Sequence, residues 1–251
     1  MLVKKRVTSN YTSVETPYSI WEHRMPDEAI KHYREALKIR RELVELDPSF
    51  KPKLADALNN LANAYYTQGL LDQAIEHYNE ALKIRREQVE IDKTYKPKLT
   101  DALNNLGVAY RNKGLLDRAI EHLKEALSIR RELVEIDEIF KPKLANTQNN
   151  LAITYYRKGN LDEAIEHYKE ALKIRRELIR KEEHNKPQFL TSLILLGIAT
   201  ATRKTEEDKI LSREMQIEAK IMLQDPIITK SPQYPDLVSL AKIFESLIKE
   251  L

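Results

Sequence analysis

Cysteine is absent from this 251-residue chain, which excludes disulfide bonds and thiolate metal sites and agrees with a reducing compartment. The formal net charge is only +3, so no strong overall field attracts nucleic acid or a membrane surface. No stretch approaches the roughly 18 apolar residues of a membrane span. The opening MLVKKRVTSNYTS has basic residues but no apolar run behind them, so it does not resemble a secretory signal. We expect a cytoplasmic protein with neither a membrane nor a nucleic-acid partner.

Patterns for catalysis and for metal binding are missing as well. The chain shows no Ser/His/Asp or Cys/His set, no Gly-rich phosphate loop and no HExxH pattern. Four histidines recur at one interval, but equivalent residues of stacked helices lie roughly 10 Å or more apart, whereas zinc ligands lie about 2 Å from the metal. They are His32, His77, His122 and His167. We expect a protein that is not an enzyme and that holds no metal or cofactor.

What the chain does contain is an internal repeat with a 45-residue period. KPKL begins at Lys51, Lys96 and Lys141, and KPQF begins at Lys186. The first three are followed by LNNLANAYYTQG, LNNLGVAYRNKG or QNNLAITYYRKG, and then by the pattern DxAIEHxxEALxIRRE. That second segment also occurs once earlier, from Asp27. The chain therefore holds three full copies, half a copy before them and a degenerate copy after them.

Each copy predicts two α-helices. In the first helix, apolar residues such as Leu54, Leu58 and Leu61 recur at helical spacing and form one stripe. Gly69, Gly114 and Gly159 would end this helix, because glycine readily adopts the left-handed conformation of a helix end. Asp72, Asp117 and Asp162 are then predicted as N-caps of a second helix that runs to about Asp92 in the first full copy.

A single helix pair cannot bury its apolar face, but a stack of pairs can. The predicted fold class is therefore all-α, an α-solenoid of antiparallel helix pairs. We expect disorder over 1–14 and one array over 15–251. Its parts are an incomplete repeat (15–51), full repeats (52–96, 97–141 and 142–186), a degenerate repeat (187–225) and a capping helix (233–251). A short helix over 17–24, with Ile20 and Trp21 packing, would begin the incomplete repeat.

The recurring positions resemble the tetratricopeptide repeat. The matching residues of the first full copy are Leu61, Ala62, Tyr65, Gly69, Ala74, Tyr78 and Ala81, and the agreement covers about residues 27–203. The LNNLA…Y…G phrase and the ALxIRRE ending are similar to the long-repeat subgroup typified by kinesin light chain. The period is longer than in that subgroup, and the proline that normally ends the second helix is replaced by Arg86, Arg131 and Arg176. The resemblance implies a right-handed superhelix whose first helices line a concave groove for a partner's peptide.

The paired asparagines are the first candidate binding residues. Asn costs roughly half a kcal/mol relative to Ala inside a helix, so its recurrence at two adjacent positions suggests a role. An amide both donates and accepts, as a peptide backbone does. The pairs are Asn59 and Asn60, Asn104 and Asn105, and Asn149 and Asn150. The alternative is that these amides bond a neighbouring helix and only determine how repeats stack.

Charge is separated between the two kinds of helix. The first helices with their entry loops contain 12 Lys and Arg but only two acids, whereas the rest of the chain has 30 bases and 37 acids. These segments are 51–69, 96–114, 141–159 and 186–203. A basic groove would attract an acidic partner segment, although a charge excess at helix ends could equally be a solvated face. The remaining predicted peptide-binding residues are Asn63, Tyr66, Arg111, Asn112, Tyr156 and Arg157.

Further alternatives stay open. The chain could be a structural self-association module whose groove is filled by its own termini or by another copy. The half copy from Asp27 could expose apolar surface and support a homo-oligomer. Ile194 and Leu195 replace the asparagine pair in the last copy, and they are either covered by the final helices or form an apolar pocket. The Arg-Arg pairs of IRRE are predicted to lie on a solvated, ion-paired face.

Overall fold

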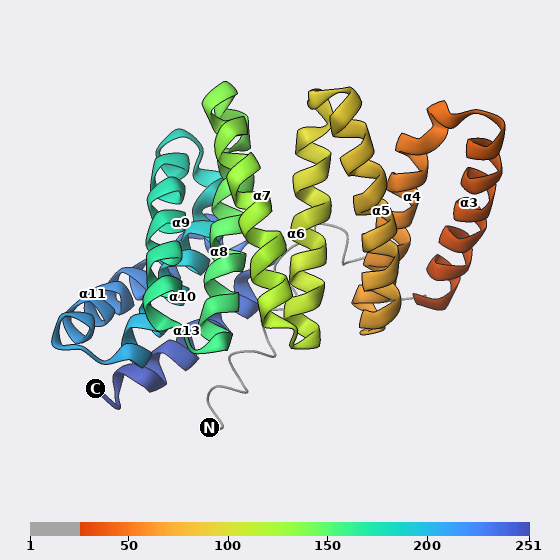
Figure 1. The fold of residues 1–251 in the computed structure, drawn as a ribbon. Helices are drawn as coiled ribbons and strands as arrows, with labels where there is room; N and C mark the ends of the chain where they lie inside the picture. Colours follow the sequence, from red (N-terminus) through yellow and green to blue (C-terminus); the bar gives the residue numbers. More distant parts are fainter. Residues whose placement is uncertain (1–25) are drawn as a thin grey trace. The chain divides into compact units, whose positions relative to one another are not determined.

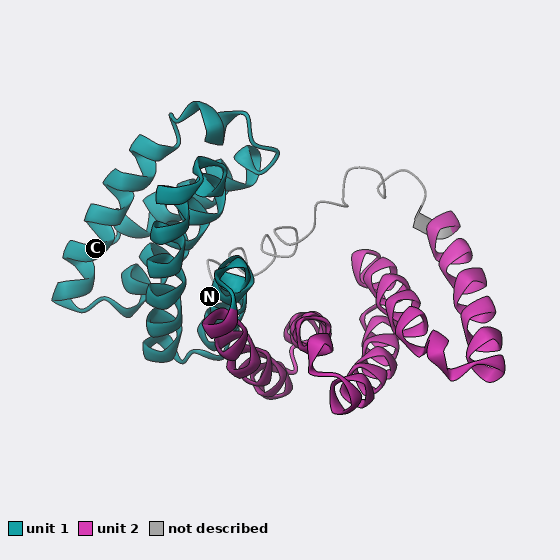
Figure 2. Cartoon of the chain, turned by 90° about the horizontal axis from the view of Figure 1, so that it is seen from above, with its two compact units in different colours: residues 1–14, 137–251 teal, residues 15–136 magenta. Residues whose placement is uncertain are grey.

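The computed structural model describes residues 26–251, which are helical almost throughout and contain no strand (Figure 1). Consecutive helices pack against one another in antiparallel pairs, so the predicted all-α fold of stacked helix pairs is confirmed. The predictions of disorder over 1–14 and of a short helix over 17–24, with Ile20 and Trp21 packing, lie outside the described residues. The described chain divides into two compact units, which are coloured separately in Figure 2.

Unit 2 contains the first described helices, over residues 26–136. Its helices are α3 (Pro26–Leu46), η2 (Pro48–Phe50), α4 (Lys51–Thr67), α5 (Leu71–Ile91), η3 (Lys93–Tyr95), α6 (Lys96–Lys113) and α7 (Leu116–Ile136). The helices α4 and α6 are the first helices of their repeats, and each packs against the second helix of its own repeat and that of the repeat before. Each first helix is therefore covered by second helices on two sides.

Unit 1 contains residues 137–251 of the described chain. Its helices are η4 (Glu138–Phe140), α8 (Lys141–Lys158), α9 (Leu161–Lys181), η5 (Glu183–Asn185), α10 (Lys186–Arg203), α11 (Glu206–Met222), α12 (Pro226–Thr229) and α13 (Tyr234–Ile248). The pairing of α8 with α9 and of α10 with α11 repeats the plan of unit 2, and α13 packs on both α10 and α11. Ile194 and Leu195 are buried, at 0% and 3% exposed, so they belong to this core rather than to an open pocket.

Glycine ends the first helices as predicted. Gly69, Gly114 and Gly159 have φ of +74°, +85° and +92°, in the left-handed region. The last copy has no glycine there, and Lys204 adopts φ of +64° after α10. Because an L-residue is strained in this region, its occurrence at this site shows that the turn is imposed by the packing of the two helices.

The prediction that Asp72, Asp117 and Asp162 are N-caps is wrong. α5 begins at Leu71, so Asp72 lies within the first turn, and Leu70 occupies the N-cap position without a side-chain hydrogen bond. Because the turn after Gly69 is short, α5 begins before Asp72. A carboxylate in the first turn still interacts favourably with the helix dipole.

Other aspartates cap the turns that join one repeat to the next. Asp47, Asp92 and Asp137 accept hydrogen bonds from the backbone N–H two residues later, at 2.8, 2.8 and 2.9 Å. Each starts a single 3-10 turn, and a proline then occupies the first turn of the next first helix. These connections keep the period constant, because each gives the same short reversal of chain direction.

No helix of residues 26–251 has the length and apolar character required to cross a membrane. The core instead forms where the apolar stripes meet. In unit 2 it includes Leu58, Leu61, Leu103 and Leu106, none of which is more than 1% exposed.

The contact between Gly197 of α10 and Phe244 of α13 allows a test of how the C-terminal helix is held. A Cβ at residue 197 would lie 2.2 Å from Cζ of the Phe244 ring, well inside contact distance. We expect Gly197→Ala to lower the free energy of unfolding by about 1–2 kcal/mol, since overpacking outweighs the roughly 1 kcal/mol gain in helix propensity. Thermal unfolding by circular dichroism measures the change.

The matched control removes the ring. In a Phe244→Ala background, the same glycine substitution should stabilise the protein rather than destabilise it, because the Cβ then enters space left by the phenyl group. Equal effects in the two backgrounds would contradict the packing argument.

Candidate functional site

The first helices of unit 2 each present a polar stripe at every seventh residue. In α4 the stripe is Lys53, Asn60 and Thr67, all exposed. In α6 the equivalent residues are Lys98, Asn105 and Asn112, of which the lysine is exposed and the amides are half-buried. Residues seven apart lie on one face of a helix. We call these six residues the open face of α4 and α6.

The paired asparagines of unit 2 divide between this open face and the contact between the two first helices. Asn105 Nδ2 donates to Asn59 Oδ1 at 3.1 Å, which links α6 to α4. Asn60 is exposed beside that bond, whereas Asn104 is only 6% exposed. Adjacent helical residues point about 100° apart, so one asparagine of a pair can contact a neighbouring helix while the other faces outward.

The third asparagine pair, in unit 1, is buried. Asn149 and Asn150 are 8% and 3% exposed, and Asn149 Nδ2 donates to Ser192 Oγ of α10 at 2.8 Å. The stacking role is therefore observed for Asn59, Asn105 and Asn149. Binding of a partner by the asparagines stays a prediction, and it is best supported at Asn60.

Tyrosine hydroxyls link successive first helices in the same way. Asn112 of α6 donates to the Tyr66 hydroxyl of α4, and Tyr156 of α8 shares a 3.1 Å hydrogen bond with Thr202 of α10. Burial raises the pKa of Tyr156, and the bond to Thr202 partly offsets this. Asn63 has another role, because it accepts from the Tyr78 hydroxyl within its own helix pair.

The two arginines expected at the site lie deeper than a binding cation usually does. Arg111 is 2% exposed and Arg157 is half-buried. The lysines that begin each KPK or KPQ instead form ion pairs with acids near the end of a second helix or just after α11. These pairs are Lys51 with Glu87 (2.9 Å), Lys96 with Glu132 (2.6 Å), Lys141 with Glu177 (3.2 Å) and Lys186 with Asp225 (2.9 Å).

Cations at the other end of the first helices also have acidic partners. Lys113 of α6 pairs with Asp72 of α5, and Arg203 of α10 pairs with Asp162 of α9 at 2.7 Å. The charge surplus of the first helices is thus largely balanced at their ends. On the open face, Lys53 has no such partner among the described residues, and Lys98 lies 3.7 Å from Asp56.

The prediction that the Arg-Arg pairs are solvated is wrong for the first arginine of the pair in each full repeat. Arg85, Arg130 and Arg175 are 4%, 3% and 4% exposed. Each donates to the first helix of its own repeat, and the acceptors are Asp56 at 2.5 Å, Asp101 at 3.0 Å and Asn146. A buried guanidinium needs an acceptor. The sequence signal for this burial is the Asp or Asn that stands 29 residues before each of these three arginines.

The second arginine of the pair is exposed and connects neighbouring second helices. Arg41 pairs with Glu80 at 2.8 Å, Arg86 with Glu125 at 2.7 Å and Arg176 with Glu218 at 3.2 Å. Arg41, Arg86 and Arg176 stand where the helix-ending proline of the resembled family would lie. The extended second helices therefore provide ion pairs between repeats, each a modest contribution because it is exposed.

The recurring histidines stack on tyrosines of the first helices. His77 on Tyr65, His122 on Tyr110 and His167 on Tyr155 have ring centroids 5.5 Å apart and nearly parallel planes. Burial lowers the pKa of His77 and of His122. In residues 26–251 no group of three His, Asp or Glu side chains could hold a metal ion. These histidines therefore act in packing.

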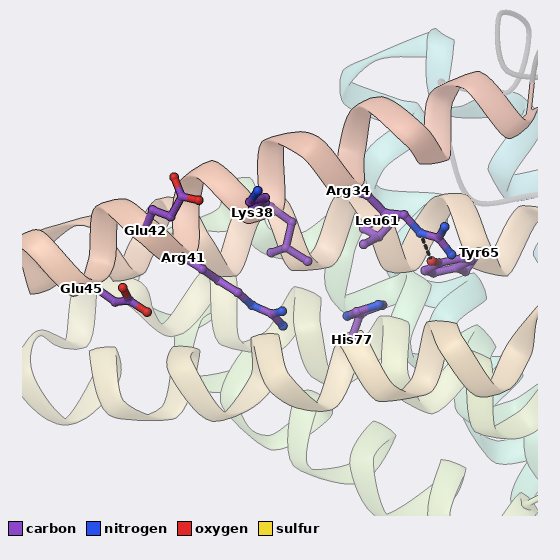
Figure 3. Close-up of a pocket in the computed structure, with 9 residues that line it drawn as sticks. Arg34, Lys38, Arg41, Glu42, Glu45, Leu61, Tyr65 and His77 are labelled. Atoms are coloured by element: carbon purple, nitrogen blue, oxygen red, sulfur yellow. Dashed lines mark hydrogen bonds between the residues drawn. The ribbon is translucent and has the colours of Figure 1, made fainter.

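A pocket of about 340 Å³ lies between α3, α4 and α5 (Figure 3). Its floor includes Leu37, Leu61 and Tyr65, and cationic side chains of α3 surround it. Arg34 Nε donates to the Tyr65 hydroxyl at 2.7 Å, and Arg41 pairs with Glu80. Arg34 and Arg41, two of the cations that line the pocket, are therefore already bonded within the protein.

Comparison with known proteins adds a family relationship. A family model described as the tetratricopeptide repeat matches four overlapping stretches of the chain, residues 21–87, 53–132, 98–177 and 143–207. Together they cover residues 21–207, well over half of the chain. No curated protein matches the sequence.

Solved structures share the fold at low sequence identity. BtubC (BKLC) from P. vanneervenii is 19% identical with a TM-score of 0.61, and the match covers 90% of this chain and 89% of that one. A putative kinesin light chain with TPR-like repeats from Podosopora anserina is 19% identical with a TM-score of 0.57, covering 87% and 95%. The apo form of RapI is 19% identical with a TM-score of 0.63, covering 88% and 58%.

The stacked histidines predict a pH dependence of stability. Because the pKa of His77 and His122 is lowered from 6.5 in the folded state, the unfolded chain binds more protons below that pH. The contribution of the two neutral histidines to the free energy of unfolding is complete above pH 6.5, and it is lost as the pH falls through their lowered pKa values. We expect the melting temperature to fall between about pH 7 and pH 5.5, above the range of ordinary carboxylates.

The unmodified protein is compared with the double variant His77→Phe/His122→Phe, which keeps a ring against each tyrosine but cannot take up a proton. This variant should show a smaller fall over the same range. His32→Phe is the control, since the His32 side chain is 75% exposed and should leave the dependence unchanged. Identical pH profiles for all three proteins would refute the assignment.

Proposed function

Because the chain belongs to the tetratricopeptide repeat family, we propose that it is a protein-interaction scaffold that binds an acidic segment of a partner protein on the open face of its first helices. The family match and the shared fold support the scaffold role. Such arrays are typically not enzymes, and we propose no catalytic activity. We also propose a cytoplasmic location, in keeping with the absence of cysteine.

The composition of the open face of α4 and α6 carries this proposal. It consists of two lysines, three amides and one threonine, and it contains no acid. The acids of the same helices, Asp56 and Asp101, each accept from a buried arginine. The lysines therefore dominate the charge of this face. Amides beside them offer hydrogen bonds to a peptide backbone, whatever its side chains.

The equivalent stripe of α8 has the same chemistry at its two ends. It holds Lys143 and Arg157, with the buried Asn150 between them. In α10 the corresponding residues are Gln188, Leu195 and Thr202, so no cation occurs on that stripe. The stripe of α10 is therefore unsuited to an acidic segment, and we propose that the segment binds the open face of α4 and α6.

Lysine substitutions test the charge preference directly. The probe is a fluorescein-labelled peptide of alternating Glu and Ser, and its Gln-Ser counterpart is the neutral reference. Lys53→Gln/Lys98→Gln should weaken binding of the acidic probe about fivefold and reduce its salt dependence, since each exposed charge contributes under about 1 kcal/mol. Fluorescence anisotropy at low and high NaCl gives both quantities.

The control is Lys83→Gln/Lys93→Gln, which makes the same charge change on α5 and η3. It should bind the acidic probe almost as the unmodified chain does. Equal losses in both double variants, or binding that ignores ionic strength, would rule out a basic face on the first helices. A mass that rises with concentration in light scattering would favour the alternative, in which the chain associates with its own copies.

Asparagine substitutions separate partner binding from stacking. Asn60 is exposed, so Asn60→Ala should weaken binding of the Glu-Ser probe while leaving the melting temperature the same or slightly higher, because Ala has the better helix propensity. Asn149 is 8% exposed and donates to Ser192, so Asn149→Ala should lower the stability by about 1–2 kcal/mol through loss of that buried hydrogen bond. A destabilised Asn60→Ala protein with undiminished probe binding would assign the outer asparagine to the scaffold as well.

A further inference from the structure

α3 and α5 have nearly the same sequence but different surroundings. Asp27–Leu43, DEAIKHYREALKIRREL, and Asp72–Gln88, DQAIEHYNEALKIRREQ, are identical at 13 of 17 positions. α5 packs against α4 of its own repeat, and α3 packs against α4 as the helix of the repeat before. No first helix of the α3 repeat occurs among residues 26–251. Among the described residues, one face of α3 therefore lacks the kind of neighbour that α4 is for α5.

The burial of individual residues shows which face this is. In α5, Ala74, Tyr78, Ala81, Ile84 and Arg85 are between 0% and 8% exposed. Their counterparts in α3 are exposed or half-buried, with Ile39 at 56%. These counterparts are Ala29, Tyr33, Ala36, Ile39 and Arg40. Tyr33 packs against the hydrophobic core of unit 2, and we call the other four residues the open face of α3. Leu46 is not part of it, because its counterpart Ile91 is also exposed.

Arg40 indicates which kind of residue the open face of α3 lacks, namely an acceptor for the guanidinium. Its counterparts Arg85 and Arg130 bond to Asp56 and Asp101, each on the first helix of the same repeat. Within residues 26–251, Arg40 has neither a hydrogen bond nor an ion pair. A half-buried guanidinium favours a neighbour that brings a carboxylate.

The sequence before α3 does not repeat the sequence of α4. The residue 45 positions before Asp56 is Tyr11, which has no carboxylate. Thr16 and Pro17 stand where Leu61 and Ala62 lie in the first full repeat. A proline in a helix interior removes a hydrogen bond and clashes with the preceding turn, at a cost of about 3 kcal/mol.

We propose that the open face of α3 binds an amphipathic helix of a partner protein that carries an acidic residue opposite Arg40. The helix takes the place that α4 has on α5. It therefore presents leucines at the spacing of Leu54, Leu58 and Leu61, and its acid lies between the first two, as Asp56 does. This docking surface is separate from the open face of α4 and α6. An experiment can therefore refute one of the two binding proposals without refuting the other.

The probe for this surface is a peptide with the sequence of residues 51–69, KPKLADALNNLANAYYTQG, because it already fits the matching face of α5. We expect the full chain to bind it in isothermal titration calorimetry, and amide hydrogen exchange to slow in α3 rather than in α5. Arg40→Asp should weaken binding about tenfold, as expected when one charge of a partly buried pair is reversed.

Charge exchange makes the test specific. A probe with Asp56→Arg should bind the Arg40→Asp chain better than it binds the unmodified chain. Lys31→Asp is the matched control, since it makes the same charge change on an exposed residue of α3 outside the open face and should leave binding unchanged. No binding to the full chain, or equal effects of Arg40→Asp and Lys31→Asp, would overturn the proposal. A concentration-dependent dimer that competes with the probe would also overturn it, because the occupant would then be a second copy.

Discussion

A buried arginine in the second helix of each full repeat is the interaction that orders the repeats. Arg85 and Arg130 have almost no exposed surface and bond to Asp56 and Asp101 on the first helix of the same repeat. A guanidinium removed from water is tolerated only with an acceptor in place, and loss of that acceptor typically costs about 3 kcal/mol. Contacts between apolar stripes hold the helices together without fixing how one helix is aligned along the other. The arginine bond, in contrast, forms in only one register of the first helix against the second helix.

The same arrangement explains why a nearly neutral protein separates its charges. Lysines at the start of the first helices pair with acids at or beyond the end of the second helices, as Lys51 does with Glu87. Exposed arginines such as Arg86 link one second helix to the next. Most charge at the helix ends is thus used between elements of the stack, and the cations of the open face of α4 and α6 stand apart from it. A count of the charged residues in the first helices therefore overestimates the positive charge that these helices could present to another molecule.

The two asparagines of a pair can have different surroundings. Asn59 bonds with Asn105 of the next first helix, while Asn60 faces outward. In α8 the equivalent pair is buried, and one of its amides bonds with Ser192. An amide that links two first helices keeps them at one distance, and this fixes the spacing of the outward residues beside it.

The sequence by itself determined the 45-residue period, the helix pairs, the glycine helix ends and the family, because these depend on residues close together in the chain. It did not show which arginine of IRRE is buried, that Asp72 lies past the N-cap, or that Asn150 is buried where Asn60 is exposed. Those features depend on neighbours from other helices, such as Asp56 for Arg85 and Ser192 for Asn149. Only the tertiary structure decides them, because stacking sets which side of each helix meets another helix and which meets water.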